Sequence, residues 1–116
     1  MAIKINTEKR IFTLETKHTM YQMQADTYGV LRHLWYGAKT GCDMSYLQDY
    51  PDVGFSGNPH DAGNDRTYSL DTLPLEYAGA GIGDFRVPAV EAVHADGSCA
   101  LDLRYYSHTV KQGKYA

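Results

Sequence analysis

Residues 12–25 read FTLETKHTMYQMQA, and this stretch already indicates the fold class. Within residues 12–16, and again within 21–25, apolar and polar side chains alternate with a period of two, which is typical of half-buried strands. The polar residues between these two segments predict a turn. A third strand is expected over residues 30–36, VLRHLWY, because β-branched and aromatic side chains favour extended backbone.

Two more strands are expected further along the chain. Residues 87–93 lead into ADGS at 95–98, which is typical of a two-residue hairpin turn, and residues 101–106 alternate again. Residues 110–116 are interpreted as a strand that enters another turn. No segment has a convincing helical period, and we therefore predict an all-β fold, an antiparallel β-sandwich.

The segment between these two groups of strands has a different composition. Residues 41–86 hold seven of the ten Asp and seven of the eleven Gly, and their net charge is −6 because Arg66 and Arg86 are the only cations. So long a connection without a regular pattern is uncommon inside a compact domain unless it has a function. We expect a long Gly/Asp-rich loop here, and we interpret residues 1–116 as a single, partial domain.

Length, charge and cysteine content exclude several classes of protein. The chain has 116 residues, whereas a complete (β/α)8 barrel needs roughly 200. A net charge of −3 argues against nucleic acid as a partner, and no apolar run approaches the roughly 20 residues of a membrane-spanning helix. The first ten residues lack the apolar core of a secretion signal, and Cys42 and Cys99 are too few for a disulfide framework. We expect a soluble, cytoplasmic chain with no membrane partner.

No residue pattern predicts a cofactor, a metal site or a catalytic centre. The five histidines are scattered without metal-ligand spacing, and residues 61–65 do not fit the alternating spacing of a calcium loop. AGIG at residues 80–83 lacks the strand and the helix that flank a phosphate-binding turn. Ser56 and Ser69 have no histidine at a recognisable spacing that would serve as their base.

The acidic loop is the best candidate for a binding site. It brings Asp49, Asp52, Asp61 and Asp65 close in sequence to Arg66. Carboxylates and a planar guanidinium are suited to hydrogen-bond the hydroxyl groups of a sugar. Ten of the fourteen aromatic residues are tyrosines, which suit both sugar rings and wet interfaces. Composition alone favours the simpler interpretation, a solvated loop in which Asp forms turns.

Three motifs carry a resemblance to a known family. They are FSGNP at residues 55–59, DRTYSLDTLPLEY at 65–77 and GDFRVPA at 83–89, and the likeness extends to LWYG at 34–37 and DLRY at 102–105. With these motifs the chain resembles the amino-terminal part of bacterial α-galactosidases of glycoside hydrolase family 36. The resemblance implies the first part of an N-terminal β-supersandwich, which in the family precedes a (β/α)8 barrel and a C-terminal β-domain.

The activity that the resemblance implies is retaining hydrolysis of terminal α-galactosides such as melibiose and raffinose. Retention requires two carboxyl groups roughly 5 Å apart, and in the family both belong to the barrel, the nucleophile within a Lys-Trp-Asp motif. Trp35, the single tryptophan of this chain, lies between Leu34 and Tyr36, so that motif is absent. We therefore predict no catalytic residue here and expect this chain to be inactive by itself.

The resemblance also implies a role for the loop. Many bacterial members form tetramers in which the N-terminal loop of one subunit reaches the active-site mouth of a neighbour. The residues of this chain that match are Asp52 and Arg66, which we expect to bind substrate. Alternatively, Arg66 pairs with Asp65 or Asp71 and only holds the loop. Two other functions stay open for the whole chain, an independent carbohydrate-binding β-sandwich module and a purely structural piece of a sandwich.

Overall fold

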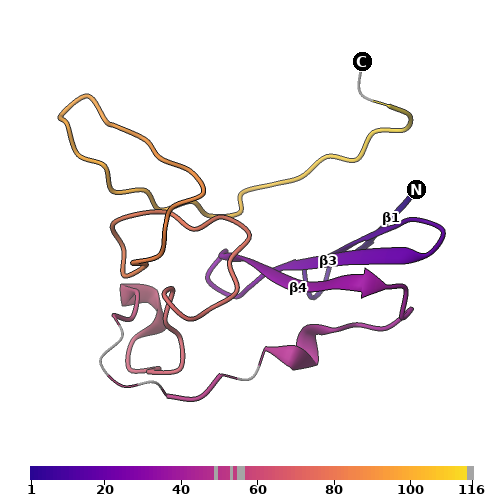
Figure 1. The fold of residues 1–116 in the computed structure, drawn as a ribbon, viewed down its shortest axis with the longest axis horizontal. Coiled ribbons are helices and arrows are strands. Elements are labelled where there is room, and N and C mark those ends of the chain that lie inside the picture. Colours follow the sequence, from indigo (N-terminus) through magenta and orange to yellow (C-terminus); the bar gives the residue numbers. More distant parts are fainter. Residues whose placement is uncertain (49, 53, 55–56, 115–116) are drawn as a thin grey trace.

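A computed structural model describes residues 1–48, 50–52, 54 and 57–114 of the chain. Its regular structure is one antiparallel sheet whose four strands follow one another in sequence order (Figure 1). The strands are β1 (Ala2–Asn6), β2 (Ile11–Glu15), β3 (Thr19–Ala25) and β4 (Leu31–Ala38), and two short 3-10 helices follow, η1 (Ser45–Leu47) and η2 (His60–Ala62). The prediction of an all-β, antiparallel fold is confirmed. Across these described residues, no helix has the length and apolar character that crossing a membrane requires.

Three of the expected strands form close to their predicted bounds, as β2, β3 and β4. Leu14 lies opposite Tyr21, which in turn lies opposite Tyr36, so the three strands present these side chains on one face. A bulge between Gln22 and Met23 shifts the register of β3 against β4. Strand β1 is an addition to the expected set, and it pairs with β2 along its whole length.

The hairpin predicted for residues 87–106 forms its turn but not its arms. The backbone N–H of His94 donates to the carbonyl oxygen of Ser98 at 2.8 Å, and Gly97 adopts the positive φ of 84° that the turn requires. The prediction that both arms are strands is wrong. The strand predicted for residues 110–116, whose last two residues lie outside the described part, is not formed in its described residues either.

The two arms do not pair because both of them bond a third segment. Ala89 in the first arm donates its N–H to the carbonyl oxygen of Ala78 at 2.9 Å. Leu101 in the second arm donates to the carbonyl oxygen of Ala80 at 2.8 Å. Both arms are therefore attached to residues 78–80, and Tyr105 in the second arm also donates to the carbonyl oxygen of Gly29 at 2.7 Å. Such isolated bonds are too few for the continuous ladder of a strand pair.

The core consists of two clusters, and the long loop builds most of one of them. The cluster against the sheet contains Ile11, Met20, Leu34 and Met44. The second cluster contains Val30, Ala62, Tyr68, Leu70 and Leu73, of which all but Val30 follow β4. The segment 41–86 is thus irregular in its backbone, as expected, but it folds back beside the strands and buries apolar side chains (Figure 1).

The same loop also covers part of the outer edge of β4. His33 donates its N–H to the carbonyl oxygen of Pro74 at 2.7 Å, and Glu76 donates to the carbonyl oxygen of Leu31 at 3.0 Å. Unpaired N–H and C=O groups at a sheet edge attract other chains. Residues 74–76 satisfy these groups of β4 and fix the start of that strand against the loop.

Because the second core cluster lies mainly in the loop, we expect a substitution there, outside every strand, to destabilise the chain. Leu73 is 1% exposed, and truncating it to alanine should lower the free energy of unfolding by about 2–5 kcal/mol, because the neighbours cannot fully close the cavity. Urea unfolding followed by tryptophan fluorescence measures this change. Val93→Ala, at a side chain that is 76% exposed, is the matched control and should change the same quantity by less than about 0.5 kcal/mol. Equal changes in the free energy of unfolding for the two substitutions would mean that the second cluster is not part of the core.

Candidate functional site

The two residues expected to bind substrate, Asp52 and Arg66, lie together in the structure. Arg66 Nε is 3.3 Å from Asp52 Oδ2, and the two side chains are 64% and 47% exposed, in that order. The alternative pairing of Arg66 with Asp65 or Asp71 is not formed, since these described carboxylates accept backbone N–H groups instead. An ion pair this exposed contributes about 0–1 kcal/mol. Both charged groups therefore remain available to a ligand.

Short turns hold both members of this pair. Asp52 Oδ1 accepts the N–H of Gly54 at 2.8 Å. Asp65 Oδ1 accepts both the hydroxyl and the N–H of Thr67, at 2.6 and 3.0 Å, which closes a turn around Arg66. These two hydrogen bonds, the hydroxyl one first, hold the pKa of the Asp65 carboxyl below its ordinary value. The charged carboxylate of Asp65 thus forms the turn, and the side chain of Arg66 remains exposed.

The other acidic residues of the candidate site do not join the Asp52–Arg66 pair in the described structure. Asp61 lies 3.3 Å from Nη2 of Arg104, a cation that is 43 positions away in the sequence. Asp49, and Phe55 and Ser56 of the FSGNP motif, lie outside the described residues. Among the residues that are described, no three His, Cys, Asp or Glu side chains gather as ligands for a metal ion.

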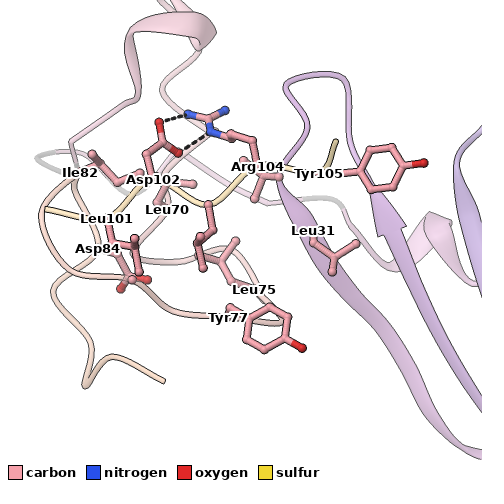
Figure 2. Close-up of a pocket in the computed structure, with 13 residues that line it drawn as sticks. Leu31, Leu70, Leu75, Tyr77, Ile82, Asp84, Leu101, Asp102, Arg104 and Tyr105 are labelled. Atoms are coloured by element: carbon pink, nitrogen blue, oxygen red, sulfur yellow. Dashed lines mark hydrogen bonds and ion pairs between the residues drawn. The ribbon is translucent and has the colours of Figure 1, made fainter. Parts of the chain in front are cut away.

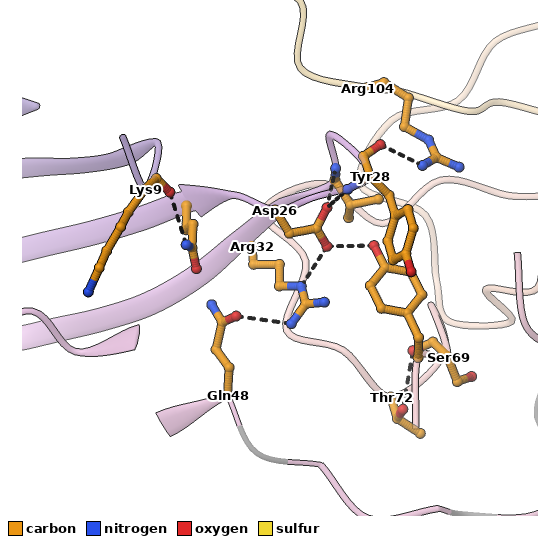
Figure 3. A network of polar contacts seen from close by, with 11 residues as sticks. Lys9, Asp26, Tyr28, Arg32, Gln48, Ser69, Thr72 and Arg104 are labelled. Carbon is orange, nitrogen blue, oxygen red and sulfur yellow. Dashed lines mark hydrogen bonds and ion pairs between the residues drawn. The ribbon is translucent and has the colours of Figure 1, made fainter. Parts of the chain in front are cut away.

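A buried polar network holds the base of the 48–68 loop, the segment between Gln48 and Tyr68 (Figure 3). Asp26, in the turn between β3 and β4, accepts hydrogen bonds at Oδ2 from Arg32 Nε at 2.9 Å and from the Tyr68 hydroxyl at 2.5 Å. Arg32 Nη1 donates to Gln48 Oε1 at 3.0 Å. One carboxylate and one guanidinium therefore reach both ends of this loop.

Sequence reasoning misses this network. Asp26 belongs to the turn signal DTYG, and Arg32 lies inside an expected strand, so each residue has a sufficient local explanation. Tyr68 is 42 positions from Asp26, too far for any pattern to connect them. One signal was present: an arginine within the largely apolar segment VLRHLWY needs a charged partner if it is buried.

A second arginine organises the part of the chain that follows the 48–68 loop. Arg86 donates from Nη1 to the carbonyl oxygen of Leu73 at 2.8 Å and from Nη2 to that of Leu70 at 2.5 Å. Its Nε lies 2.9 Å from Asp84 Oδ1. Burial opposes the charged form of Asp84, but the hydrogen bonds from Arg86 outweigh burial and hold the pKa of this carboxyl below its ordinary value. These contacts join the LDTLP and GDFR motifs.

An apolar cavity of about 240 Å³ lies between the start of β4 and residues 101–105 (Figure 2). Its lining includes Leu31, Leu70, Leu75, Ile82, Leu101 and Leu103. Arg104 pairs with Asp102 at its edge (Figure 2), whereas neither Asp52 nor Arg66 lines it. Most of its lining is apolar and neither residue of the candidate site belongs to it, so this cavity is separate from that site.

The fold and the site together define a class: an all-β domain that presents an exposed carboxylate and guanidinium on a long, packed loop. Comparison with known proteins identifies the family. The description "Glycosyl hydrolase family 36 N-terminal domain" fits residues 29–116, and the chain belongs to this family. The resemblance seen in the sequence motifs is confirmed.

This chain is similar over nearly its whole length to several known proteins. It is 52% identical over 115 residues to the bifunctional alpha-galactosidase/sucrose kinase AgaSK of Mediterraneibacter gnavus, covering 99% of this chain and 12% of that protein. The solved galactosidase domain of AgaSK superposes with a TM-score of 0.95 at 51% identity, over 99% of this chain and 16% of that one. The alpha-galactosidase AgaA of Geobacillus stearothermophilus, solved in complex with raffinose, gives a TM-score of 0.82 at 36% identity, over 91% and 15%. The chain spans less than a fifth of each relative.

Because Tyr68 belongs to the buried network, we expect the folded chain to lose stability at alkaline pH. Burial first, and then the hydrogen bond to Asp26, raise the pKa of its phenol above the ordinary value of 10.0. The stabilisation by this group is complete below pH 10 and is lost as the pH rises above it, because the unfolded chain then releases a proton that the folded chain keeps. The free energy of unfolding should fall by up to about 1.4 kcal/mol per pH unit more steeply than in Tyr68→Phe.

Urea unfolding at a series of pH values between 9 and 11 measures this slope. Tyr106→Phe, at a side chain that is 95% exposed, is the control and should keep the steep slope of the parent chain. If Tyr68→Phe has the same slope as the parent, the phenol titrates alike in the folded and unfolded chain and the prediction is wrong.

Proposed function

We propose that this chain is the N-terminal, non-catalytic portion of an α-galactosidase and that Asp52 and Arg66 belong to the rim of its substrate site. The observation that carries the proposal is the exposed 3.3 Å pair that these residues form on a loop of the family 36 N-terminal domain. A carboxylate accepts and a planar guanidinium donates, so together they suit two adjacent hydroxyl groups of one sugar.

The substrate we propose is an oligosaccharide with a terminal α-galactoside. The support is that similar proteins are α-galactosidases and that one of them is solved with raffinose. The hydrolysis itself is assigned to the barrel that the family carries, where two carboxyl groups about 5 Å apart would give retention of configuration. Within this chain the proposal assigns binding alone.

A second part of the proposal concerns assembly. The exposed loop is suited to reach the active-site mouth of a neighbouring subunit in a homo-oligomer, a tetramer in the family. Loops on a rigid sheet often present binding residues in this way. The tetramer and the cytoplasmic location stay predictions.

An independent carbohydrate-binding module is the second candidate. The observation that favours it is that Asp52 and Arg66 meet within this one chain, without a partner subunit. It requires that the isolated chain bind a galactoside, seen as chemical-shift changes of the 48–68 loop in NMR spectra. Unchanged spectra at millimolar raffinose would exclude this candidate and leave the α-galactosidase proposal standing.

A chimaera tests the leading proposal. In it, residues 1–116 replace the matching segment of the M. gnavus AgaSK protein, whose 52% identity and TM-score of 0.95 favour a correct fit. Arg66→Ala in this chimaera should raise KM for raffinose about tenfold, since a hydrogen bond from a charged donor contributes about 1.5–3 kcal/mol. The kcat for an aryl α-galactoside should change less than about twofold, because the reacting groups are untouched.

Two controls make the result specific. Lys17→Ala removes an exposed cation from the turn between β2 and β3 and should leave both constants unchanged. Light scattering of each variant reports the state of assembly. An unchanged KM in Arg66→Ala would refute the rim role, and a changed assembly with unchanged sugar kinetics would instead favour the purely structural interpretation.

A further inference from the structure

The position of the Asp52–Arg66 pair cannot be set by the pair itself. A single contact of 3.3 Å between two half-exposed side chains is weak and is screened by salt. Asp52 lies four positions after Gln48, and Arg66 lies two positions before Tyr68. What holds Gln48 and Tyr68, the two ends of the 48–68 loop, therefore contributes to the distance between the two charged groups, together with the packing of Tyr50 and Ala62 in the second core cluster.

Both ends are held by the same guanidinium. Arg32 Nη1 donates to Gln48 Oε1 at 3.0 Å, and its Cζ lies 4.9 Å from the centroid of the Tyr68 ring. Figure 3 shows the hydrogen bonds from Arg32 to Gln48 and to Asp26. A planar guanidinium can bond one group at its edge while its face covers an aromatic ring.

Asp26 anchors this guanidinium to the sheet. Its Oδ2 accepts Arg32 Nε at 2.9 Å and the Tyr68 hydroxyl at 2.5 Å. Its Oδ1 accepts the N–H groups of Tyr28 and Val30, each at 2.9 Å, so the carboxylate cannot rotate without breaking the turn before β4. Asp26, Arg32 and Tyr68 are 8%, 8% and 5% exposed, and in such surroundings these bonds are stronger than the solvent-exposed pair they support.

We propose that Arg32, fixed by Asp26, is a positioning residue for substrate binding: it holds both ends of the 48–68 loop at a set spacing, so that Asp52 and Arg66 reach the same sugar. This inference rests on the proposed rim function of those two residues. It extends the site from the exposed loop to a buried cluster that touches no substrate.

Two substitutions test the two ends of the loop separately. Tyr68→Phe removes the hydroxyl that bonds Asp26, and Gln48→Met removes the amide oxygen that bonds Arg32, both with little change in volume. In the AgaSK chimaera, each should raise KM for raffinose about threefold to tenfold with little change in kcat. In a background that carries both Asp52→Ala and Arg66→Ala, neither should raise KM further, because both groups that they position are gone.

Conservative variants separate positioning from loss of stability. Gln48→Glu keeps an acceptor for Arg32 and should keep the parental KM; it loses no other hydrogen bond, since Gln48 Nε2 has no partner among the described residues. Tyr28→Phe is the matched control for Tyr68→Phe, because its ring packs edge-on against Tyr68 with centroids 4.7 Å apart while its hydroxyl makes no hydrogen bond within the described part of the chain. It should also keep the parental KM.

The outcomes distinguish the two proposals. If Arg66→Ala itself leaves KM unchanged, the rim function fails and the positioning role fails with it. If Arg66→Ala raises KM but Tyr68→Phe and Gln48→Met do not, only the positioning role is overturned. The same holds if their effects add to that of the Asp52→Ala/Arg66→Ala double variant, or if Tyr28→Phe has an equal effect.

Discussion

The fold of this chain depends on a buried ion pair between Asp26 and Arg32. Asp26 and Arg32 lie 2.9 Å apart and are each 8% exposed, so neither charge would be tolerated in the interior without the other. Asp26 also closes the turn before β4 through the N–H groups of Tyr28 and Val30. The same two side chains thus shape the sheet and, through the Tyr68 hydroxyl, attach the long loop to it.

The backbone of the long loop forms turns and two hydrogen bonds to β4, and side chains hold the rest of it in place. Its carbonyl groups lack a ladder, and Arg86 supplies hydrogen bonds to those of Leu70 and Leu73, whose side chains fill the second core cluster. The ion pairs of the chain differ in how deeply they are buried. The pair of Asp26 and Arg32 in the interior organises the backbone, whereas Asp52 and Arg66 form an exposed pair.

The prediction of strands is confirmed for the three segments that form β2, β3 and β4. Residues 12–16, 21–25 and 30–36 alternate or favour extended backbone, and each finds its neighbour across a short turn. The second arm of the predicted hairpin, residues 101–106, alternates as well, yet it bonds Ala80 and Gly29 and not the first arm. Alternation records which face a side chain takes, but not which backbone will supply the hydrogen bonds.

The sequence by itself determined the all-β class, the family motifs and, through those motifs, the two exposed candidates Asp52 and Arg66. Local periodicity and contiguous motifs are sufficient for these, because they involve residues that are neighbours along the chain. Only the tertiary structure decided that Arg32 joins Gln48 to Tyr68. A buried charge needs its partner close in space and not close in sequence, so such pairings leave no local pattern from which they could be predicted.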